Sequence, residues 1–289
     1  MRTARSGLLG ASIVSLRIKV WGCRGSIACP APTHLRYGGN TTSLEVDAGE
    51  KKFLLDCGTG VRNLGQELMK NGSREGFLLL THTHWDHING FPFFRPAFEP
   101  DRKYHILAGH LYDKQGIKAV FETQMDNPMF PVPLEAMKAK LLFEDFQAGE
   151  SLDLGQGEGL KVKTCKLNHP NDATGYRIEH GGKAFCLITD TEHVPGQPDQ
   201  NILKLIEGAD LVLYDSTYTE EEFPSKIGWG HSTWEEGVKL CKAANVKRLG
   251  IFHHDPEHDD VFMDKLSSDA EKAWPNAFVV REQMELIVD

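Results

Sequence analysis

The hydrophobic and polar positions of the chain fall into short runs, and most of these runs have the period of a β-strand. Residues 16–21 alternate apolar and basic side chains, as the two faces of a half-buried strand do. Similar alternating or short apolar runs recur and are bounded by Gly, Pro, Asn or Asp. They predict further strands at residues 42–47, 52–56, 77–80, 104–108, 160–166, 175–179, 184–189, 211–215 and 248–252, and two short strands that close the chain.

Segments with helical spacing separate these strands. They predict helices at residues 61–70, 114–124, 199–207 and 232–244, and a final helix capped by Asp259 or Asp260. Ser232 with Glu235 three residues later is a capping-box pattern, which places the start of the fourth helix.

The order of these elements predicts an α+β fold. Strands come in runs in each half of the chain, with helices between and after them, which favours two stacked sheets with helices outside. No linker separates the halves, so residues 16–289 are predicted to form a single domain after an extension, residues 1–15. Arg2 and Arg5 precede an apolar run, but it lacks the cleavage site of a secretory signal, so an extended or mis-assigned start is preferred.

Composition narrows the function classes. The chain has 289 residues, with 32 Lys plus Arg against 41 Asp plus Glu and a formal net charge of −9. The acidic excess argues against a non-specific nucleic-acid binder, and no apolar run approaches the roughly 18 residues of a membrane span. Six cysteines without a C-x-x-C pair suit reduced thiols. A soluble, cytoplasmic protein is therefore expected, with Cys186 and Cys241 in its core.

A dense group of metal-ligand side chains follows the predicted strand at residues 77–80. Four of them lie within six residues: His82, His84, Asp86 and His87. Imidazole together with carboxylate suits zinc, manganese or iron. Alternate residues of an extended segment point to one side, so His82 and His84 can bind one ion. Asp86 and His87 lie beyond a turn and can reach a second ion.

Three further candidates lie at the ends of predicted strands: His169, Asp190 and His253. Side chains at strand ends are held rigidly and stay reachable by substrate, which suits metal ligands. Each is weak alone, because an Asp at a strand end is often a turn residue or a helix cap. Together with the first group they complete two sites of nitrogen and oxygen ligands.

The pattern His-x-His-x-Asp-His, followed by a later His, a later Asp and a final His, resembles the metallo-β-lactamase superfamily from residue 20 to residue 253. The resemblance implies a four-layer αββα sandwich with a site for two divalent metal ions at one edge. The ligand sets that it implies are His82, His84 and His169 for the first ion, and Asp86, His87 and His253 for the second, with Asp190 bridging the two.

Other positions carry over from the same resemblance. Asp56 matches the superfamily's first motif and is expected to orient the metal-binding loop by hydrogen bonds, and Asp86 is expected to act in catalysis as well. His254 is adjacent to His253 and is the alternative ligand. The β-lactamases of the dizinc type carry a Cys where this chain has Asp190, so β-lactamase activity is not expected.

The C-terminal motifs are similar to those of the phosphodiesterase branch, which includes ribonuclease Z, the phosphoribosyl cyclic phosphate phosphodiesterases and cyclic-nucleotide phosphodiesterases. They are Asp215-Ser216-Thr217, Gly230-His231-Ser232-Thr233 and Phe252-His253-His254-Asp255-Pro256. The resemblance implies that Asp215 orients His231 and that His231 protonates the departing oxygen. The two metals then supply a bridging hydroxide as nucleophile. The structural alternative is that His231 only precedes a helix cap.

Substrate contacts are the least specified part of the sequence. Tyr176 and Arg177 are candidates to place the phosphate, and a strand start with a solvated Arg is the alternative. Asn40 lies in a glycine-containing loop that either allows close approach of a ligand or is only a tight loop. The aromatic and Pro-rich residues 91–94 and 130–133 favour a wall or lid for a small ligand, or a dimer contact.

The leading hypothesis is a hydrolase with two divalent ions (zinc, or manganese or iron) that cleaves a small cyclic phosphodiester such as a 3′,5′-cyclic nucleotide. The expected partner is this small molecule, without nucleic acid or membrane, and the chain is expected to form a homodimer. One alternative is a ribonuclease Z-like nuclease for tRNA 3′ processing, which the lack of a Gly-rich basic arm disfavours. Another is a thioester or lactone hydrolase on the same scaffold.

Overall fold

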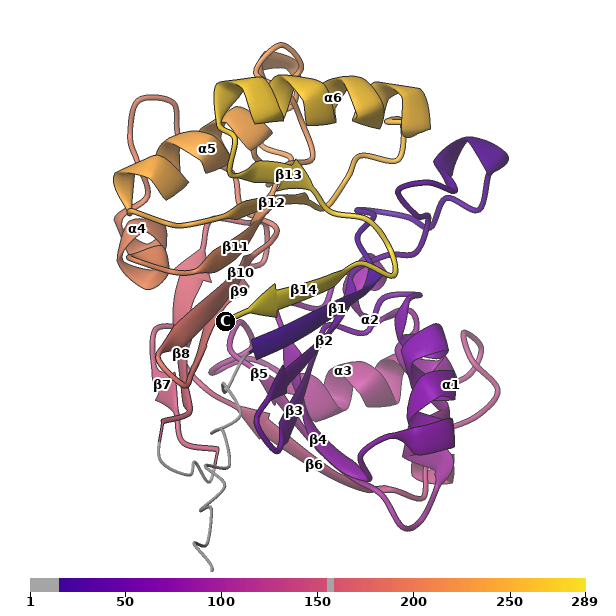
Figure 1. Cartoon of the computed structure of the whole chain (residues 1–289). Coiled ribbons are helices and arrows are strands. Elements are labelled where there is room, and N and C mark those ends of the chain that lie inside the picture. Colours follow the sequence, from indigo (N-terminus) through magenta and orange to yellow (C-terminus); the bar gives the residue numbers. More distant parts are fainter. Residues whose placement is uncertain (1–15, 155–158) are drawn as a thin grey trace, which may run out of the picture.

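Two seven-stranded sheets packed face to face form the centre of the molecule (Figure 1). The computed structural model describes residues 16–154 and 159–289, so the predicted extension, residues 1–15, lies outside the described residues. The first sheet has the order β14-β1-β2-β3-β4-β5-β6. Its strands are β1 (Leu16–Gly22), β2 (Ser43–Ala48), β3 (Lys51–Leu55), β4 (Glu75–Leu80), β5 (Lys103–Ala108), β6 (Lys140–Asp145) and β14 (Glu285–Val288).

The second sheet has the order β13-β12-β11-β10-β9-β8-β7. Its strands are β7 (Ser151–Leu152), β8 (Lys161–Leu167), β9 (Ala173–His180), β10 (Lys183–Ile188), β11 (Leu211–Asp215), β12 (Leu249–Phe252) and β13 (Ala277–Val279). Parallel pairing runs from β3 to β6 in the first sheet and from β10 to β13 in the second. Parallel strands end at the same edge, which gives each sheet an edge of carboxyl-terminal loops.

Apolar side chains between the sheets form the central core. Leu16, Ile18 and Val20 of β1 are fully buried, whereas the residues between them are half-buried, as the alternating pattern predicts. They share one apolar cluster with Phe185 and Leu187 of β10 in the other sheet. Each fully buried aliphatic or aromatic side chain of this kind stabilises the fold by about 1.5–3 kcal/mol.

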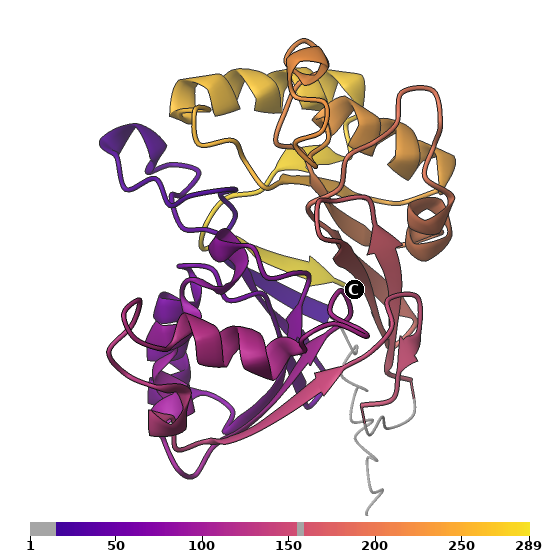
Figure 2. The same cartoon turned by 180° about the vertical axis from the view of Figure 1, so that it is seen from behind.

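Helices cover the two outer faces, so the molecule has four layers (Figures 1 and 2). The helices on the first sheet are α1 (Val61–Asn71) and α3 (Ile117–Gln124). Those on the second sheet are α4 (Gln200–Ile206), α5 (Trp234–Ala243) and α6 (Asp260–Ala273), which also bury Cys186 and Cys241. The one-turn helix α2 (Trp85–Ile88) follows β4. This arrangement confirms the predicted αββα sandwich.

The helices of the described residues include none that is long and apolar enough to cross a membrane.

Local structure differs from prediction at two kinds of position. Thr233, and not Ser232, caps α5, because Oγ1 of Thr233 accepts a hydrogen bond of 3.1 Å from N of Glu236. Of the two predicted caps of α6, Asp259 is the one that accepts the first backbone amides. The short strands β6 and β7 were not predicted. Both are edge strands, and every side chain of β6 is exposed or half-buried, so its sequence lacks a buried apolar run.

Candidate metal centre

The loops that follow the carboxyl ends of several strands meet at one edge of the sandwich. In the second sheet, β8, β10, β11 and β12 run in the same direction, so their following loops share an edge. The loop after β4 of the first sheet lies against them, because Nδ1 of His84 is 3.0 Å from Nε2 of His169. Predicted site residues from both halves of the chain are thereby brought together.

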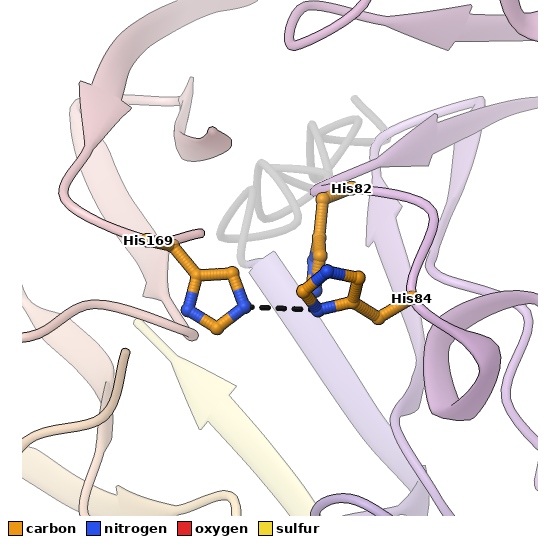
Figure 3. A group of neighbouring side chains, drawn as sticks. All are labelled: His82, His84 and His169. Carbon is orange, nitrogen blue, oxygen red and sulfur yellow. Dashed lines mark hydrogen bonds between the residues drawn. The ribbon is translucent and has the colours of Figure 1, made fainter. Parts of the chain in front are cut away.

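His82, His84 and His169 form the first group of candidate ligands (Figure 3). They offer ring nitrogens that lie within 4.8 Å of one another. His82 and His84 come from the extended segment after β4, and His169 enters from the second sheet. Nδ1 of His169 donates to the carbonyl oxygen of Gly230 over 2.7 Å, which leaves the lone pair of its Nε2 directed at the other two rings.

Asp86, His87, Asp190 and His253 form the second group, and all four are buried. Nε2 of His87 lies 3.2 Å from Oδ2 of Asp86 and 3.2 Å from Oδ2 of Asp190. Nδ1 of His87 donates to Oδ2 of Asp56 over 2.8 Å. Asp56 therefore fixes the ring so that its Nε2 faces the group, which is the orienting contact predicted for this residue.

Asp190 stands between the two groups and turns one carboxylate oxygen to each. Its Oδ1 is 3.7 Å from Nε2 of His82 and 3.7 Å from Nε2 of His169. Its Oδ2 is 3.2 Å from Nε2 of His87 and 3.4 Å from Nε2 of His253. A carboxylate with this placement can contribute a ligand atom to both sites at once.

The donor atoms of these groups fit divalent cations. Among the described residues, Nε2 of His82 and Nε2 of His87 are buried atoms without a hydrogen-bond partner of good geometry. Buried ring nitrogens without a partner are costly, and a metal ion would satisfy them. Mixed imidazole and carboxylate sets suit zinc, manganese or iron.

The electrostatics of the two groups differ. Burial lowers the pKa of His82, His84 and His169, so these rings are neutral donors. Burial also lowers the pKa of His87, but the carboxylates around it, Asp190 first, outweigh burial and raise the pKa well above its usual range. The second group is thus an anionic environment in which a cation is favoured.

Several site residues adopt a strained backbone conformation. Asp56, Asp190 and His253 have φ values of +60°, +60° and +64°, in the left-handed region that costs a non-glycine residue about 1–3 kcal/mol. Asp56 is held there by hydrogen bonds of 2.8 Å from N and from Oγ1 of Thr81. The surrounding fold therefore keeps these side chains aimed at the centre.

His231 lies beside both groups and is paired with Asp215. Nδ1 of His231 donates to Oδ2 of Asp215 over 2.9 Å and lies 3.9 Å from Oδ1 of Asp190. Asp215 also accepts from the backbone amides of Thr191 and Thr217, at 3.0 Å and 3.1 Å. Burial lowers the pKa of His231, but the surrounding carboxylates, Asp215 first, together outweigh burial and raise the pKa to about 9. This is the geometry of a proton donor held by a carboxylate.

Glu192 was not predicted from the sequence, yet it fixes the loop that carries His231. Its Oε2 accepts hydrogen bonds of 2.8 Å from N of Gly228 and from N of Gly230. Gly230 has φ +87°, and a Cβ there would lie 2.4 Å from Nδ1 of His169. Nothing in the local sequence marks Glu192, because its partners are distant backbone amides.

The structure distinguishes His253 from His254. Nε2 of His253 lies in the second group, 3.3 Å from Oδ2 of Asp86. Nε2 of His254 is instead 2.7 Å from the carbonyl oxygen of Val280, and its ring meets Tyr37 edge-on. His253 is therefore the histidine placed for ligation, and the alternative is not.

The predicted substrate contacts lie outside the two groups. Tyr176 is buried between the sheets, where its hydroxyl donates to a backbone carbonyl at the end of β4 over 2.7 Å. Arg177, on the opposite face of β9, bonds Glu179 over 2.6 Å and two carbonyls near the end of α4. The predictions for these two residues are wrong, because both side chains are used by the fold itself. Asn40 donates to Glu282 over 3.1 Å, and its substrate contact stays a prediction.

Arg24 ties the N-terminal loop to the second group. The side chain is fully buried. Its guanidinium donates to three backbone carbonyls, those of Gly38, Asp255 and His258, over 2.9–3.2 Å. Two residues later, N of Ser26 donates to Oδ2 of Asp86 over 2.8 Å. Arg24 therefore positions the loop that orients one ligand carboxylate.

Replacing Arg24 by Ala is expected to lower the free energy of unfolding by about 3 kcal/mol or more, because it leaves several buried carbonyls without donors, at about 1–3 kcal/mol each. Urea denaturation followed by circular dichroism measures this change. The matched control is Arg36→Ala, which removes an exposed ion pair with Asp264 and should leave the midpoint nearly unchanged. Equal midpoints for the two variants would contradict the role assigned to Arg24.

Known proteins share this fold and this chain's motifs. The family model of the β-lactamase superfamily domain matches residues 51–254. A ribonuclease Z from Porphyromonas gingivalis is 22% identical, over 95% of this chain and 99% of the relative. The metallo-β-lactamase fold protein YhfI from Bacillus subtilis superposes with a TM-score of 0.71 at 17% identity, over 94% of this chain and 99% of that one. A diphosphatase from the PhnP family superposes with a TM-score of 0.67 at 16% identity, over 94% of this chain and 97% of that one. The chain therefore belongs to the metallo-β-lactamase superfamily of metal-dependent hydrolases, in the phosphodiesterase branch that includes ribonuclease Z.

Proposed function

We propose that the protein is a phosphodiesterase with two metal ions that hydrolyses a small cyclic phosphodiester, such as a 3′,5′-cyclic nucleotide. The observation that carries the proposal is the position of His231, which is held by Asp215 and stands 3.9 Å from the carboxylate shared by the two ligand groups. A proton donor at this place suits a reaction with a poor leaving group. A phosphodiester with an alkoxide leaving group is such a substrate.

The residues present fit two cations. His82, His84 and His169 would hold the first, and Asp86, His87 and His253 the second, with Asp190 shared; these are the groups whose donor atoms lie together. When bound, the ions supply an activated water and neutralise charge on the phosphoryl oxygens.

The chain's own contribution is to hold and deliver a proton. Because Nδ1 of His231 donates to Asp215, the ring's second nitrogen, Nε2, is the atom that can donate to substrate. Within the described part of the chain, this Nε2 has no hydrogen-bond partner. Asp215 keeps the ring in one orientation because two backbone amides and Oγ1 of Thr217 hold its own oxygens.

Charge favours a small substrate. The net charge of −9 opposes tight binding of a large polyanion such as tRNA, and a diphosphatase is among the proteins of similar fold. The second candidate, a tRNA 3′-processing nuclease, is favoured by one observation, the similarity to a ribonuclease Z along 95% of this chain.

The test is hydrolysis by protein reconstituted with zinc or manganese. We expect turnover of 3′,5′-cyclic AMP and of the general diester bis(p-nitrophenyl) phosphate, and no cleavage of a precursor tRNA. Cleavage of the tRNA alone would establish the second candidate instead. Turnover of a thioester or a lactone without any diester hydrolysis would refute both candidate functions. It would support the remaining hypothesis, a thioester or lactone hydrolase with the same fold.

A further inference from the structure

A cleft of about 690 Å³ opens beside the second ligand group. Its volume lies in the range of about 300–1,000 Å³ that holds small-molecule ligands. The apolar side chains that line it include Ile27, Trp85, Pro92, Phe93, Met129 and Phe130. We call it the Trp85 cleft. The cleft is lined by some residues of both aromatic and Pro-rich stretches, residues 91–94 and 130–133. Phe91 and Phe94 of the first stretch are instead buried in the core.

The Trp85 cleft adjoins the candidate metal centre through residues next to the candidate ligands, although no candidate ligand is among its lining residues. Trp85 stands between the ligand residues His84 and Asp86 in the chain, and Thr83 and Ser26 also line the cleft. N of Ser26 donates to Oδ2 of Asp86 over 2.8 Å. A molecule whose phosphate lies at the second ligand group would therefore have the cleft beside it.

Large apolar side chains are exposed in this cleft. Trp85 is 83% exposed, Met129 64%, Ile27 63% and Phe93 56%. Exposed apolar side chains that gather in one place mark binding sites more often than isolated ones do. Trp85 lies between two candidate ligands in the chain and Ile27 follows Ser26, so an occupant of this cleft would lie beside a substrate bound at the metal centre.

The wall of the cleft is firmly anchored. Phe93 meets Phe130 edge to face with ring centroids 5.7 Å apart. Beneath it, Phe91 stacks on Phe121 of α3 with centroids 3.9 Å apart. Nε2 of Gln124, also on α3, donates to the carbonyl oxygen of Ile88 at the end of α2 over 2.9 Å. The wall is therefore built before a ligand arrives, which lowers the entropic cost of binding.

We infer that the Trp85 cleft binds a planar aromatic ring carried by one ester group of the substrate, as the base of a nucleotide is, by stacking on Trp85 and Phe93. This inference rests on the proposed function. Aromatic side chains stack with any base because every base has a π-face. Asn89 and Gln115 also line the cleft and supply polar groups that can meet the edge of such a ring. A bare sugar phosphate has no group that would use these aromatic walls.

The test compares two ligands that differ only in the base. Adenosine 5′-phosphate and ribose 5-phosphate are titrated by calorimetry into the full-length, metal-loaded protein. We expect the nucleotide to bind about ten- to a hundredfold more tightly, the contribution of one stacked base. Trp85→Ala should remove most of this ratio without changing the affinity for ribose 5-phosphate, and Trp85→Phe should retain it.

Controls separate stacking from indirect effects. Metal content is measured for every variant, because Trp85 adjoins two ligand residues. Val261→Ala changes a side chain that is 73% exposed on α6, outside the cleft, and should keep the wild-type ratio. Equal affinities of the wild type for the two ligands, or equal losses for both in Trp85→Ala, would overturn the inference.

The remaining outcomes are also decisive. If neither 3′,5′-cyclic AMP nor bis(p-nitrophenyl) phosphate is hydrolysed but the base still strengthens binding through Trp85, the proposed function fails and the cleft assignment stands. If the diester is hydrolysed and the base adds nothing, the cleft assignment fails alone. If Trp85→Ala converts a dimer to a monomer in sedimentation and keeps the ligand ratio, the cleft is occupied by a second copy of the chain and the inference is wrong.

Discussion

His231→Ala is expected to lower kcat for 3′,5′-cyclic AMP by about 10²–10⁴-fold, the usual contribution of a positioned general acid, while the metal content stays at the wild-type level. The ring donates from Nδ1 to Asp215 and has Nε2 left for the substrate. A ribose alkoxide is a poor leaving group and needs that proton. A p-nitrophenolate ion leaves without one, so turnover of bis(p-nitrophenyl) phosphate should fall far less. Steady-state kinetics on the two substrates measures the difference.

Two further variants sharpen this test. Asp215→Asn keeps the shape of the carboxylate but weakens its hold on the ring, so it should reproduce part of the effect on the cyclic nucleotide. His105→Ala is the matched control, because His105 lies on β5 and contacts Glu144 at 2.8 Å, outside the ligand groups. Equal losses on the two substrates would disprove the role as proton donor. Loss of metal from His231→Ala would instead make His231 a ligand, since it also lies within reach of His169 and Asp190.

The parts of the fold that could be predicted are those whose signal is local. Residues 211–215 were predicted as a strand and form β11 with the same limits, because a buried parallel strand is a short continuous apolar run. The histidine motif after β4 could be assigned because the extended backbone places His82 and His84 on one side. The edge strand β6 was not predicted, because all its side chains are at least partly exposed and its sequence gives no buried apolar run.

Residues whose partners are distant in the chain could not be assigned. Tyr176 and Arg177 are consecutive in a strand, so their side chains lie on opposite faces of the sheet. The side chain of Tyr176 is in the core, and that of Arg177 is on the outer face. The short distance of these two residues from His169 in the sequence does not indicate which face of the sheet each side chain occupies. Glu192 was not predicted because its hydrogen-bond partners are backbone amides more than thirty residues away in the chain. A single sequence indicates such long-range hydrogen bonds only where a family motif carries them, as it does for Asp56 and His87.

Asp190→Ala is expected to abolish hydrolysis and to lower the affinity for both metal ions by more than about 100-fold, since even the loss of a residue that only supports a ligand costs about 10–100-fold. Asp190 is the one side chain in the two groups that turns an oxygen to each, with Oδ1 toward His82 and His169 and Oδ2 toward His87 and His253. Its loss should therefore empty both sites together. Inductively coupled plasma mass spectrometry of dialysed protein measures the metal content.

The pattern of loss across variants tests the bridging geometry itself. His84→Ala removes one nitrogen from the first group only, so it should weaken one ion while the second stays bound. Asp269→Ala, which removes an exposed carboxylate paired with Lys272, is the matched control and should keep both ions and full activity. If the Asp190→Ala variant retains both ions and turns over substrate, the carboxylate of Asp190 does not bridge the two metal sites. Loss of the second ion alone would assign Asp190 to the second group, and the 3.7 Å contacts of Oδ1 would then have no role in metal binding.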